Sequence, residues 1–486
     1  MRRLLAIFVL SCLSTLVASD LPSTPLNLSD PDVVSLLTNL QGNILQDHGR
    51  HYARHIFITF GSNSSASRWL VSLLSKHVTS AYEELHNKET DLFGSLLLSA
   101  SGYEKLGVDE SKIPSQQVFR LGMQDLDTPV RLGNFSLPNP CSDPPVEDWD
   151  EPFAEAAPNA LAVVAVGGSG ALDKLNFVET VIRKVVSLFG GDVIGVYNGY
   201  RIKNMDGLDE EHFGFADGIS NPLFYEEDYK AALEQTTTNK FISGADPLAQ
   251  LELVLVKDEL SNSSVSSFAY GSYLVYRRLE ENVGLFRQFG KTIQELLGKQ
   301  GINVSQDDAE SRMIGRRKDG VPLVHDLSGV KPDDRNTAIN FNFDGDKDGA
   351  QCPFASHIRK VNPRGSSTAK NDAANKIVRR NMVYGRKSRR EAKGLLFLCF
   401  QSALDVGFLV EQVDWANNEE FGEGPPPRVG LDMVIGQYLP QNPPKVEQTV
   451  WEDPIVKLQV KDCVTMRGGE YFFAPAITTL QNILDL

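Results

Sequence analysis

The chain has few cysteines, a deficit of positive charge and no long hydrophobic run beyond its N-terminus. Five cysteines occur in 486 residues, and their wide spacing fits neither a zinc knuckle nor a small disulfide scaffold, so at most one disulfide is expected. The 48 basic residues are outnumbered by 63 acidic ones, which argues against nucleic acid or an anionic membrane as a partner. The longest later apolar run, GLLFLCF, is too short to span a bilayer.

The N-terminus reads as a signal peptide over residues 1–19. Two arginines precede a short apolar run and then small residues suited to cleavage. Five Asn-X-Ser sequons, at Asn27, Asn63, Asn134, Asn262 and Asn303, agree with a secretory route. We therefore expect a secreted, extracellular glycoprotein in which four cysteines remain after Cys12 is removed.

Length and hydrophobic periodicity predict a globular α+β protein. The content of 41% hydrophobic and 23% charged residues is that of a folded chain with a large core. The pattern predicts strands over 55–60, 160–168 and 192–202 and helices over 67–88 and 171–190. A second set then begins, with apolar segments over 251–256, 267–278, 393–402 and 433–439 and a helix over 279–299. Two similar domains are a hypothesis, since no sequence repeat is visible.

The stretch FGFADGISNP, residues 213–222, places one acid, Asp217, among turn-forming residues. By itself it reads as a solvated turn. Two other segments carry chemically useful side chains: CPFASHIRKVNPR, residues 352–364, has a histidine that could bind iron, and IVRRNMVYG, residues 377–385, has two arginines that keep their charge. Each segment taken alone has an ordinary structural explanation.

Together, in this order, the three segments resemble the dye-decolourising peroxidase family. GFADG matches the family's GxxDG motif, and the other two match its proximal-histidine and distal-arginine segments. The resemblance covers roughly residues 37–480. It implies two ferredoxin-like domains that enclose haem b, one at 37–205 and one at 225–480, with the GxxDG junction at 206–224.

The resemblance also implies roles for individual residues. His357 would be the proximal iron ligand, Asp217 the distal acid/base and Arg379 its partner, although Arg380 competes for that role. Asn381 follows, where many members of the family have glycine, and we expect its tolerance of positive φ to preserve the turn. Such an enzyme would use hydrogen peroxide, through a high-valent ferryl haem, to oxidise dyes, phenols or lignin-like aromatics, as a monomer or weak dimer.

Further residues are expected in the haem environment. The resemblance places Leu395 and Phe397, which share one face of a predicted strand, over the distal haem face. Arg359 lies two residues after His357 and would pair with a propionate through its bidentate guanidinium. Gly214 and Gly218 would let the backbone approach a flat cofactor. Bulky dyes would exchange electrons with surface aromatics, for which Tyr384 and Trp415 are the candidates.

The chemistry of peroxide cleavage suits these residue types. A carboxylate can take the proton from one peroxide oxygen and return it to the other, and a guanidinium supplies a fixed positive charge. Because an ordinary aspartate titrates near pH ~4, Asp217 would act in acid, where a distal histidine would be protonated. The sequence thus predicts an acidic optimum.

Other readings of the sequence stay open. Cys352-Pro353 could supply a thiolate to haem, and DGDKDG at 344–349 imitates a calcium loop but has Ala355 at its twelfth position. His51 and His55 have the spacing of a zinc pair, but no acid accompanies them. No hydrolase motif is present. The main alternative to an enzyme is a secreted haem carrier that uses His357 alone.

Overall fold

A computed structural model describes residues 21–132, 135–205, 207–236, 239–261, 268–324, 336–364, 372–386, 391–422, 429–452 and 455–486. The expected signal peptide and the sequons at Asn134 and Asn262 lie outside these residues. Its strands are β1 Tyr52–Thr59, β2 Phe93–Leu98, β3 Val130–Leu132, β4 Phe135–Leu137, β5 Ala160–Val166, β6 Asp192–Tyr200, β7 Val256–Lys257, β8 Tyr270–Glu281, β9 Val378–Arg379, β10 Met382–Tyr384, β11 Gly394–Gln401, β12 Gln448–Glu452, β13 Ile455–Leu458 and β14 Val464–Ala474.

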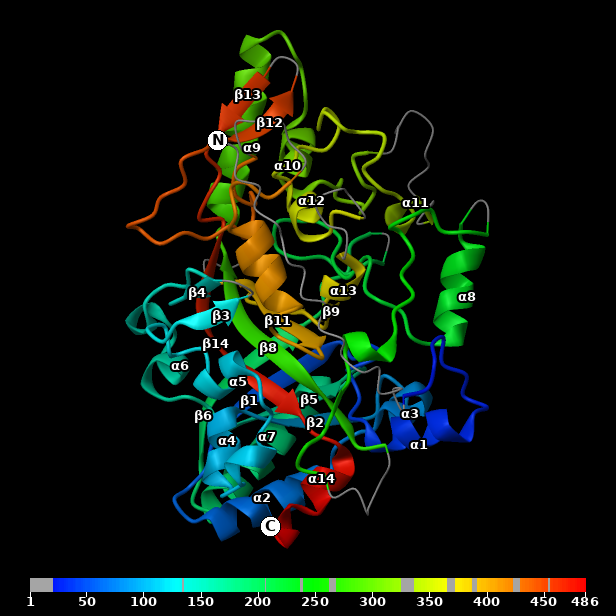
Figure 1. Cartoon of the computed structure of the whole chain (residues 1–486), viewed down its shortest axis with the longest axis vertical. Helices are drawn as coiled ribbons and strands as arrows, with labels where there is room; N and C mark the ends of the chain where they lie inside the picture. The colour runs from blue at the N-terminus through cyan, green and yellow to red at the C-terminus, as the bar shows by residue number, and fades with distance from the viewer. Residues whose placement is uncertain are drawn as a thin grey trace, which may run out of the picture.

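The helices are mostly short and lie around the sheet (Figure 1). They are α1 Pro31–Asn39, α2 Ser64–Ser75, α3 Ala81–His86, α4 Ala100–Lys105, α5 Gln117–Leu121, α6 Glu151–Glu155, α7 Ala171–Leu188, α8 Glu226–Glu234, α9 Val283–Lys299, α10 Gln306–Ile314, α11 Asn336–Ile339, α12 His357–Val361, α13 Asp372–Asn375 and α14 Ile477–Gln481, with a π-helical turn, η4, over Val410–Ala416. Among the described residues, no helix combines the length and apolar character that a membrane crossing requires.

The central sheet contains the same strand order twice. Four strands of the N-terminal half pair as β2-β5-β1-β6, and four of the C-terminal half pair as β14-β8-β11-β10, all antiparallel. Numbered within each half, the two orders are 2-3-1-4 and 4-1-3-2, which are the same order read from opposite ends. The fold is therefore α+β with two ferredoxin-like units, as the sequence predicted.

Within the sheet, two narrow strand pairings join the units. Tyr200 of β6 pairs with Val383 of β10, and Phe473 of β14 pairs with Leu98 of β2. In Figure 1 the C-terminal helix α14, in red, lies beside α2, in blue, so the end of the chain returns to the N-terminal unit. The segment 206–224 lies between the last strand of the first unit and the first strand of the second.

Several predicted elements differ from the observed ones. The helix predicted over 67–88 is two helices, α2 and α3, because Ser80 begins a new helix: its side chain accepts from the Glu83 amide, and the Glu83 carboxylate accepts from the Ser80 amide. The apolar segment 251–256 forms mainly a 3-10 turn, and 433–439 forms a loop instead of a strand. The buried strand β5, predicted from the run ALAVVAV, is present and wholly buried.

Candidate active site

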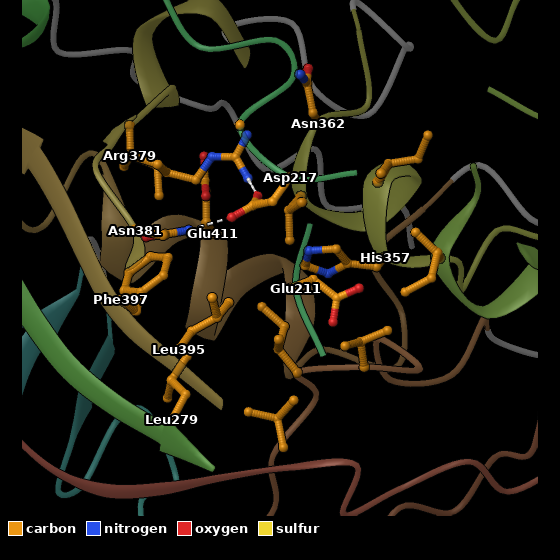
Figure 2. Close-up of a pocket in the computed structure, with 18 of the residues that line it drawn as sticks. Glu211, Asp217, Leu279, His357, Asn362, Arg379, Asn381, Leu395, Phe397 and Glu411 are labelled. Carbon is orange, nitrogen blue, oxygen red and sulfur yellow. Dashed lines mark hydrogen bonds and ion pairs between the residues drawn. The ribbon is translucent and has the colours of Figure 1, made fainter. Parts of the chain in front are cut away.

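The largest group of predicted site residues lies around one cavity. Asp217, Arg379, His357, Leu395 and Phe397 all line it, although the chain contributes them from a turn, two strands and a short helix. Figure 2 shows the acid and the arginine meeting at one side of this cavity, while the imidazole enters it from α12.

Asp217 and Arg379 form an ion pair at the cavity wall. Nη1 of Arg379 lies 3.6 Å from Oδ1 of Asp217, and Nδ2 of Asn381 donates to Oδ2 over 3.4 Å. The side chains of the pair are 28% and 22% exposed, so the carboxylate keeps an oxygen within reach of a molecule in the cavity. This arrangement combines a proton acceptor with a fixed positive charge.

The tail of the FGFADGISNP turn fixes Arg379. Asn221 accepts from the Arg379 amide at 3.2 Å and donates to its carbonyl at 3.3 Å, as a neighbouring strand would. The guanidinium also donates to the carbonyl of Ile219 at 2.9 Å. The same turn therefore carries the acid and holds the arginine against it.

Arg380 has a different position from its neighbour. It is 5% exposed and donates to the carbonyl oxygens of Asn43 and Ile44 at 2.8 and 2.9 Å. This bonding ties β9 to the segment after α1. Of the two competing arginines, Arg379 is the one at the cavity.

Asn381 does not adopt the positive φ that we expected of it. Its side-chain oxygen instead accepts from the Leu398 amide at 3.2 Å, between the two stretches where β9 and β10 pair with β11. The asparagine thus bridges an interruption of the ladder and still directs its amide nitrogen at Asp217.

His357 begins α12, and its ring is oriented by a carboxylate. Nδ1 lies 2.9 Å from Oδ2 of Asp432, whose other oxygen accepts from the amides of Val434 and Ile435. Asp432 is 2% exposed. Because the bond occupies Nδ1, Nε2 is the nitrogen available to a metal. No local pattern in the sequence points to Asp432, which lies 75 residues beyond the histidine, and the nearer acids Glu411 and Asp414 do not fill this role.

Arg359 does not face the cavity, so its predicted pairing with a propionate is wrong for this structure. Two residues along a helix turn a side chain through ~200°, which places Arg359 away from the side that His357 faces. Its guanidinium binds Asp346 at 2.8 Å and lies over the rings of Phe343 and Phe354.

Arg316 and Arg364, unlike Arg359, line the cavity. Both donate to the hydroxyl of Ser220, at 3.2 and 3.0 Å. Burial, and repulsion by Arg364 and Arg379, lower the pKa of Arg316 to about 9. Such converging positive charge suits an anionic ligand. Arg364 ends the segment CPFASHIRKVNPR, so the sequence did contain a signal for it.

The two predicted glycines have different surroundings. Gly218 lines the cavity with φ +74°, and a Cβ there would meet open space. Gly214 also has positive φ, +97°, but it faces a neighbouring cavity beside Lys318. Both positions need glycine for backbone conformation, but the expected close approach to a cofactor fits Gly218 alone.

The predicted electron-transfer aromatics are not at the surface. Tyr384 and Trp415 are each 6% exposed. The Tyr384 ring lies under Arg278, 4.3 Å from ring centroid to guanidinium carbon, and Trp415 stacks on Phe421. Their packing into the core explains both residues without electron transfer, and the expectation of a surface position is wrong.

The alternative sites find no support in the described residues. Cys352 is buried outside the cavity lining, and burial raises the pKa of its thiol to about 11, which opposes a thiolate. No group of three metal-binding side chains occurs in the ranges given above, and Asp346 of the DGDKDG stretch pairs with Arg359. His51 and His55 lie on or beside strand β1, where spacing by four does not create a helical face.

The fold and site define a two-unit α+β protein with an acid–arginine pair and an oriented histidine in one cavity. The model of the family described as "Dyp-type peroxidase, C-terminal" matches residues 209–421 of this chain. The multifunctional dye peroxidase DyP2 of an Amycolatopsis species is 34% identical, over 93% of this chain and 97% of that protein. Peroxidase 2 of Mycetinis scorodonius is 29% identical, over 93% and 88%.

Solved structures agree with these relatives. The DyP-type peroxidase of an Anabaena species has a TM-score of 0.78 and 31% identity, covering 92% of this chain and 94% of that one. The Amycolatopsis DyP2 structure has a TM-score of 0.76 and 30% identity, covering 92% and 96%. The chain belongs to the DyP-type family of haem-binding peroxidases, enzymes that use hydrogen peroxide and a reducing substrate.

Proposed function

We propose that this chain is a secreted haem b peroxidase that oxidises bulky aromatic compounds, including anthraquinone-type dyes and phenols. The observation that carries the proposal is the meeting of Asp217 and Arg379 on a wall of the cavity that His357 also enters. A haem carrier would need the histidine and has no use for the acid–arginine pair.

Asp217, Arg379 and Asn381 each have a defined task in this proposal. Asp217 accepts the proton of one peroxide oxygen and returns it to the departing oxygen, so that water leaves. Arg379 offsets the negative charge that develops during O–O cleavage, and it does so without changing its own protonation. Asn381 holds the second oxygen of Asp217, which keeps the carboxylate aimed at the cavity.

The cavity residues fit a haem. Haem supplies the iron at which peroxide is cleaved, and His357 is free to bind that iron through Nε2 because Asp432 occupies Nδ1. Leu395 and Phe397 provide an apolar wall. The guanidinium groups of Arg316 and Arg364, which converge on Ser220, would hold the propionates.

Secretion rests on the N-terminal segment and the sequons. Two of the sequon asparagines make local hydrogen bonds in the described residues. Asn63 caps α2 by accepting from the Ala66 amide, and Asn27 accepts from the Ser29 amide. Expression in a secreting eukaryotic host, followed by N-terminal sequencing of the released protein, tests cleavage near residue 19. An uncleaved N-terminus would contradict it.

Peroxide-dependent bleaching of an anthraquinone dye by the haem-loaded protein tests the activity. Wild type is expected to bleach the dye in acid, Asp217→Asn to bind haem normally but bleach about 10²- to 10⁴-fold more slowly, and His357→Ala to lose stable haem binding. Wild type that binds haem and bleaches nothing across the acidic range would identify a carrier instead.

A further inference from the structure

Two buried glutamates in the cavity wall have no part in the mechanism above. Glu211 precedes the turn that carries Asp217, and Glu281 ends β8. They are 9% and 5% exposed, line the same cavity as Asp217 and lie within hydrogen-bonding reach of each other. The largest influences on the charge of the two carboxyls are burial, backbone amides and other carboxyl groups.

Two such carboxyls cannot both ionise at low cost. Burial, and then the repulsion between them, raises the pKa of Glu281; burial is also the main cause that raises the pKa of Glu211. Glu211 accepts from the amides of Phe213 and Phe215 at 2.5 and 2.8 Å, whereas in the described part of the chain Glu281 accepts from one backbone amide, that of His212, at 3.1 Å. The extra donor favours the negative charge on Glu211 and the proton on Glu281.

The bonds of this pair shape the backbone that leads to Asp217. The Glu211 carboxylate holds two amides of the FGFADG stretch, and its own amide donates to the Phe215 carbonyl at 3.2 Å. The negative charge of Asp217 also acts on both glutamates. Loss of the remaining proton would therefore bring three carboxylates together at one wall.

We propose that Glu211 and Glu281 are a proton-sharing pair that positions Asp217. One carboxylate anchors the turn, and the proton between the two keeps a second negative charge away from the catalytic acid. As the pH rises and that proton is lost, the two carboxylates repel each other. The Glu211 carboxylate then no longer holds the turn, and Asp217 moves away from Arg379. The pair thus sets the alkaline limit of the reaction, that is, the pH above which its rate falls. This inference rests on the proposed function.

Among the described residues, the titratable groups that act on the pair or lie directly beside it include neighbours in its own segment and one tyrosine. Asp217 and Glu210 lie on the same segment as Glu211. Nε2 of His212 lies 2.7 Å from the carbonyl oxygen of Tyr384. The charge of Glu281 also acts on the Tyr384 phenol. Because burial raises the pKa of that phenol to a value far above neutrality, it does not titrate in the range where the pair loses its proton.

Glu281→Gln tests the pair, because an amide imitates the protonated acid and cannot ionise. Infrared difference spectra at neutral pH are expected to show a protonated-carboxyl band in wild type that this variant lacks. In dye bleaching, its rate in acid should change little, whereas its alkaline limit should move upward by about one pH unit or more. Glu211→Gln removes the repulsion that adds to the effect of burial on Glu281, so the remaining carboxyl should lose its proton, and the infrared band should fade, at a lower pH than in wild type; this variant replaces Glu281→Gln if that variant does not fold.

Glu84→Gln is the matched control. Glu84 is another buried acid that accepts from a backbone amide, that of Asn43, and burial raises its pKa to about 8, but it does not line the cavity. Its substitution should remove its own infrared band without moving the alkaline limit. An unchanged band in both pair variants, or a Glu281→Gln limit that coincides with that of wild type, would overturn the proposal. If wild type does not bleach dye, the proposed function fails, but the infrared result still decides whether the proton is shared.

Discussion

Arg379 and Arg380 are neighbours in sequence, and their substitution is expected to affect different properties. Arg379→Gln removes the positive charge that lies 3.6 Å from Asp217. At about this distance the Coulomb attraction between two unit charges near a protein surface is about 4 kcal/mol, which desolvation offsets in part, and loss of a comparable charge-stabilising group slows catalysis by about 10²- to 10³-fold, or roughly 2.7–4 kcal/mol. The variant should keep its fold, because much of the Arg379 side chain faces the cavity.

Arg380→Gln should instead destabilise the protein. Its buried guanidinium donates to the carbonyls of Asn43, Ile44 and Arg379. Hydrogen bonds to a charged group are worth about 1.5–3 kcal/mol each, and a shorter amide retains some of them. We expect a loss of about 3–5 kcal/mol in the free energy of unfolding, with a turnover per bound haem that stays close to that of wild type in the folded fraction.

Both variants are measured in the same two assays. Initial rates of peroxide-dependent dye bleaching are normalised to bound haem, and unfolding is followed by circular dichroism in urea. If Arg380→Gln abolished turnover in fully folded protein while Arg379→Gln left it intact, Arg380 would be the partner of Asp217 in catalysis. The assignment made from the geometry would then be wrong.

Three further substitutions test the site. Asp432→Asn removes the charged acceptor of the His357 ring and should speed haem loss to an acceptor protein by about 10- to 100-fold. Gly218→Ala places a side chain at φ +74° and should cost about 1–2 kcal/mol of stability and slow dye bleaching, whereas Gly345→Ala, at an open position without positive φ, should do neither. Glu411→Gln tests linkage: burial raises the pKa of Glu411 from 4.5 to about 8, so folded wild type binds a proton more tightly than unfolded chain and loses stability as pH rises through that range. In urea unfolding, the free energy of unfolding of the variant should fall less steeply with rising pH than that of wild type. Equal slopes for the two proteins would refute this.

The features that the sequence predicted are those with local patterns. The apolar run of β5 and the alternating pattern of β11 were enough to predict these two strands. The alternation also predicted that Leu395 and Phe397 lie on one face of β11, and both line the cavity. The order of three short segments selected His357, Asp217 and Arg379 as candidates, and the three side chains line one cavity. These residues needed no knowledge of distant contacts, because the segments that carry them are themselves distinctive.

The predictions that failed depended on contacts between distant segments. Asp432 reaches His357 across 75 residues, and nothing in its surroundings in sequence distinguishes it from other acids. Arg359 was assigned by its nearness to the histidine, but the helical rotation of α12 directs it to Asp346. Asn381 was interpreted through its backbone, whereas its side chain makes the decisive bond to the Leu398 amide.

The length of the FGFADGISNP motif has a physical explanation in these contacts. A carboxylate in a turn would require only a few residues, but here each part of the motif has its own partner. Its first residues bind the Glu211 carboxylate through two amides, its centre presents Asp217 to the cavity, and its tail holds Arg379 through Ile219 and Asn221. The acid and its positive partner therefore belong to one rigid unit, although 162 residues separate them in sequence (379 − 217). Asn221→Ala, which removes both bonds to the Arg379 backbone, is expected to act on the distance between Asp217 and Arg379, and hence on the rate of peroxide cleavage before it affects the binding of haem.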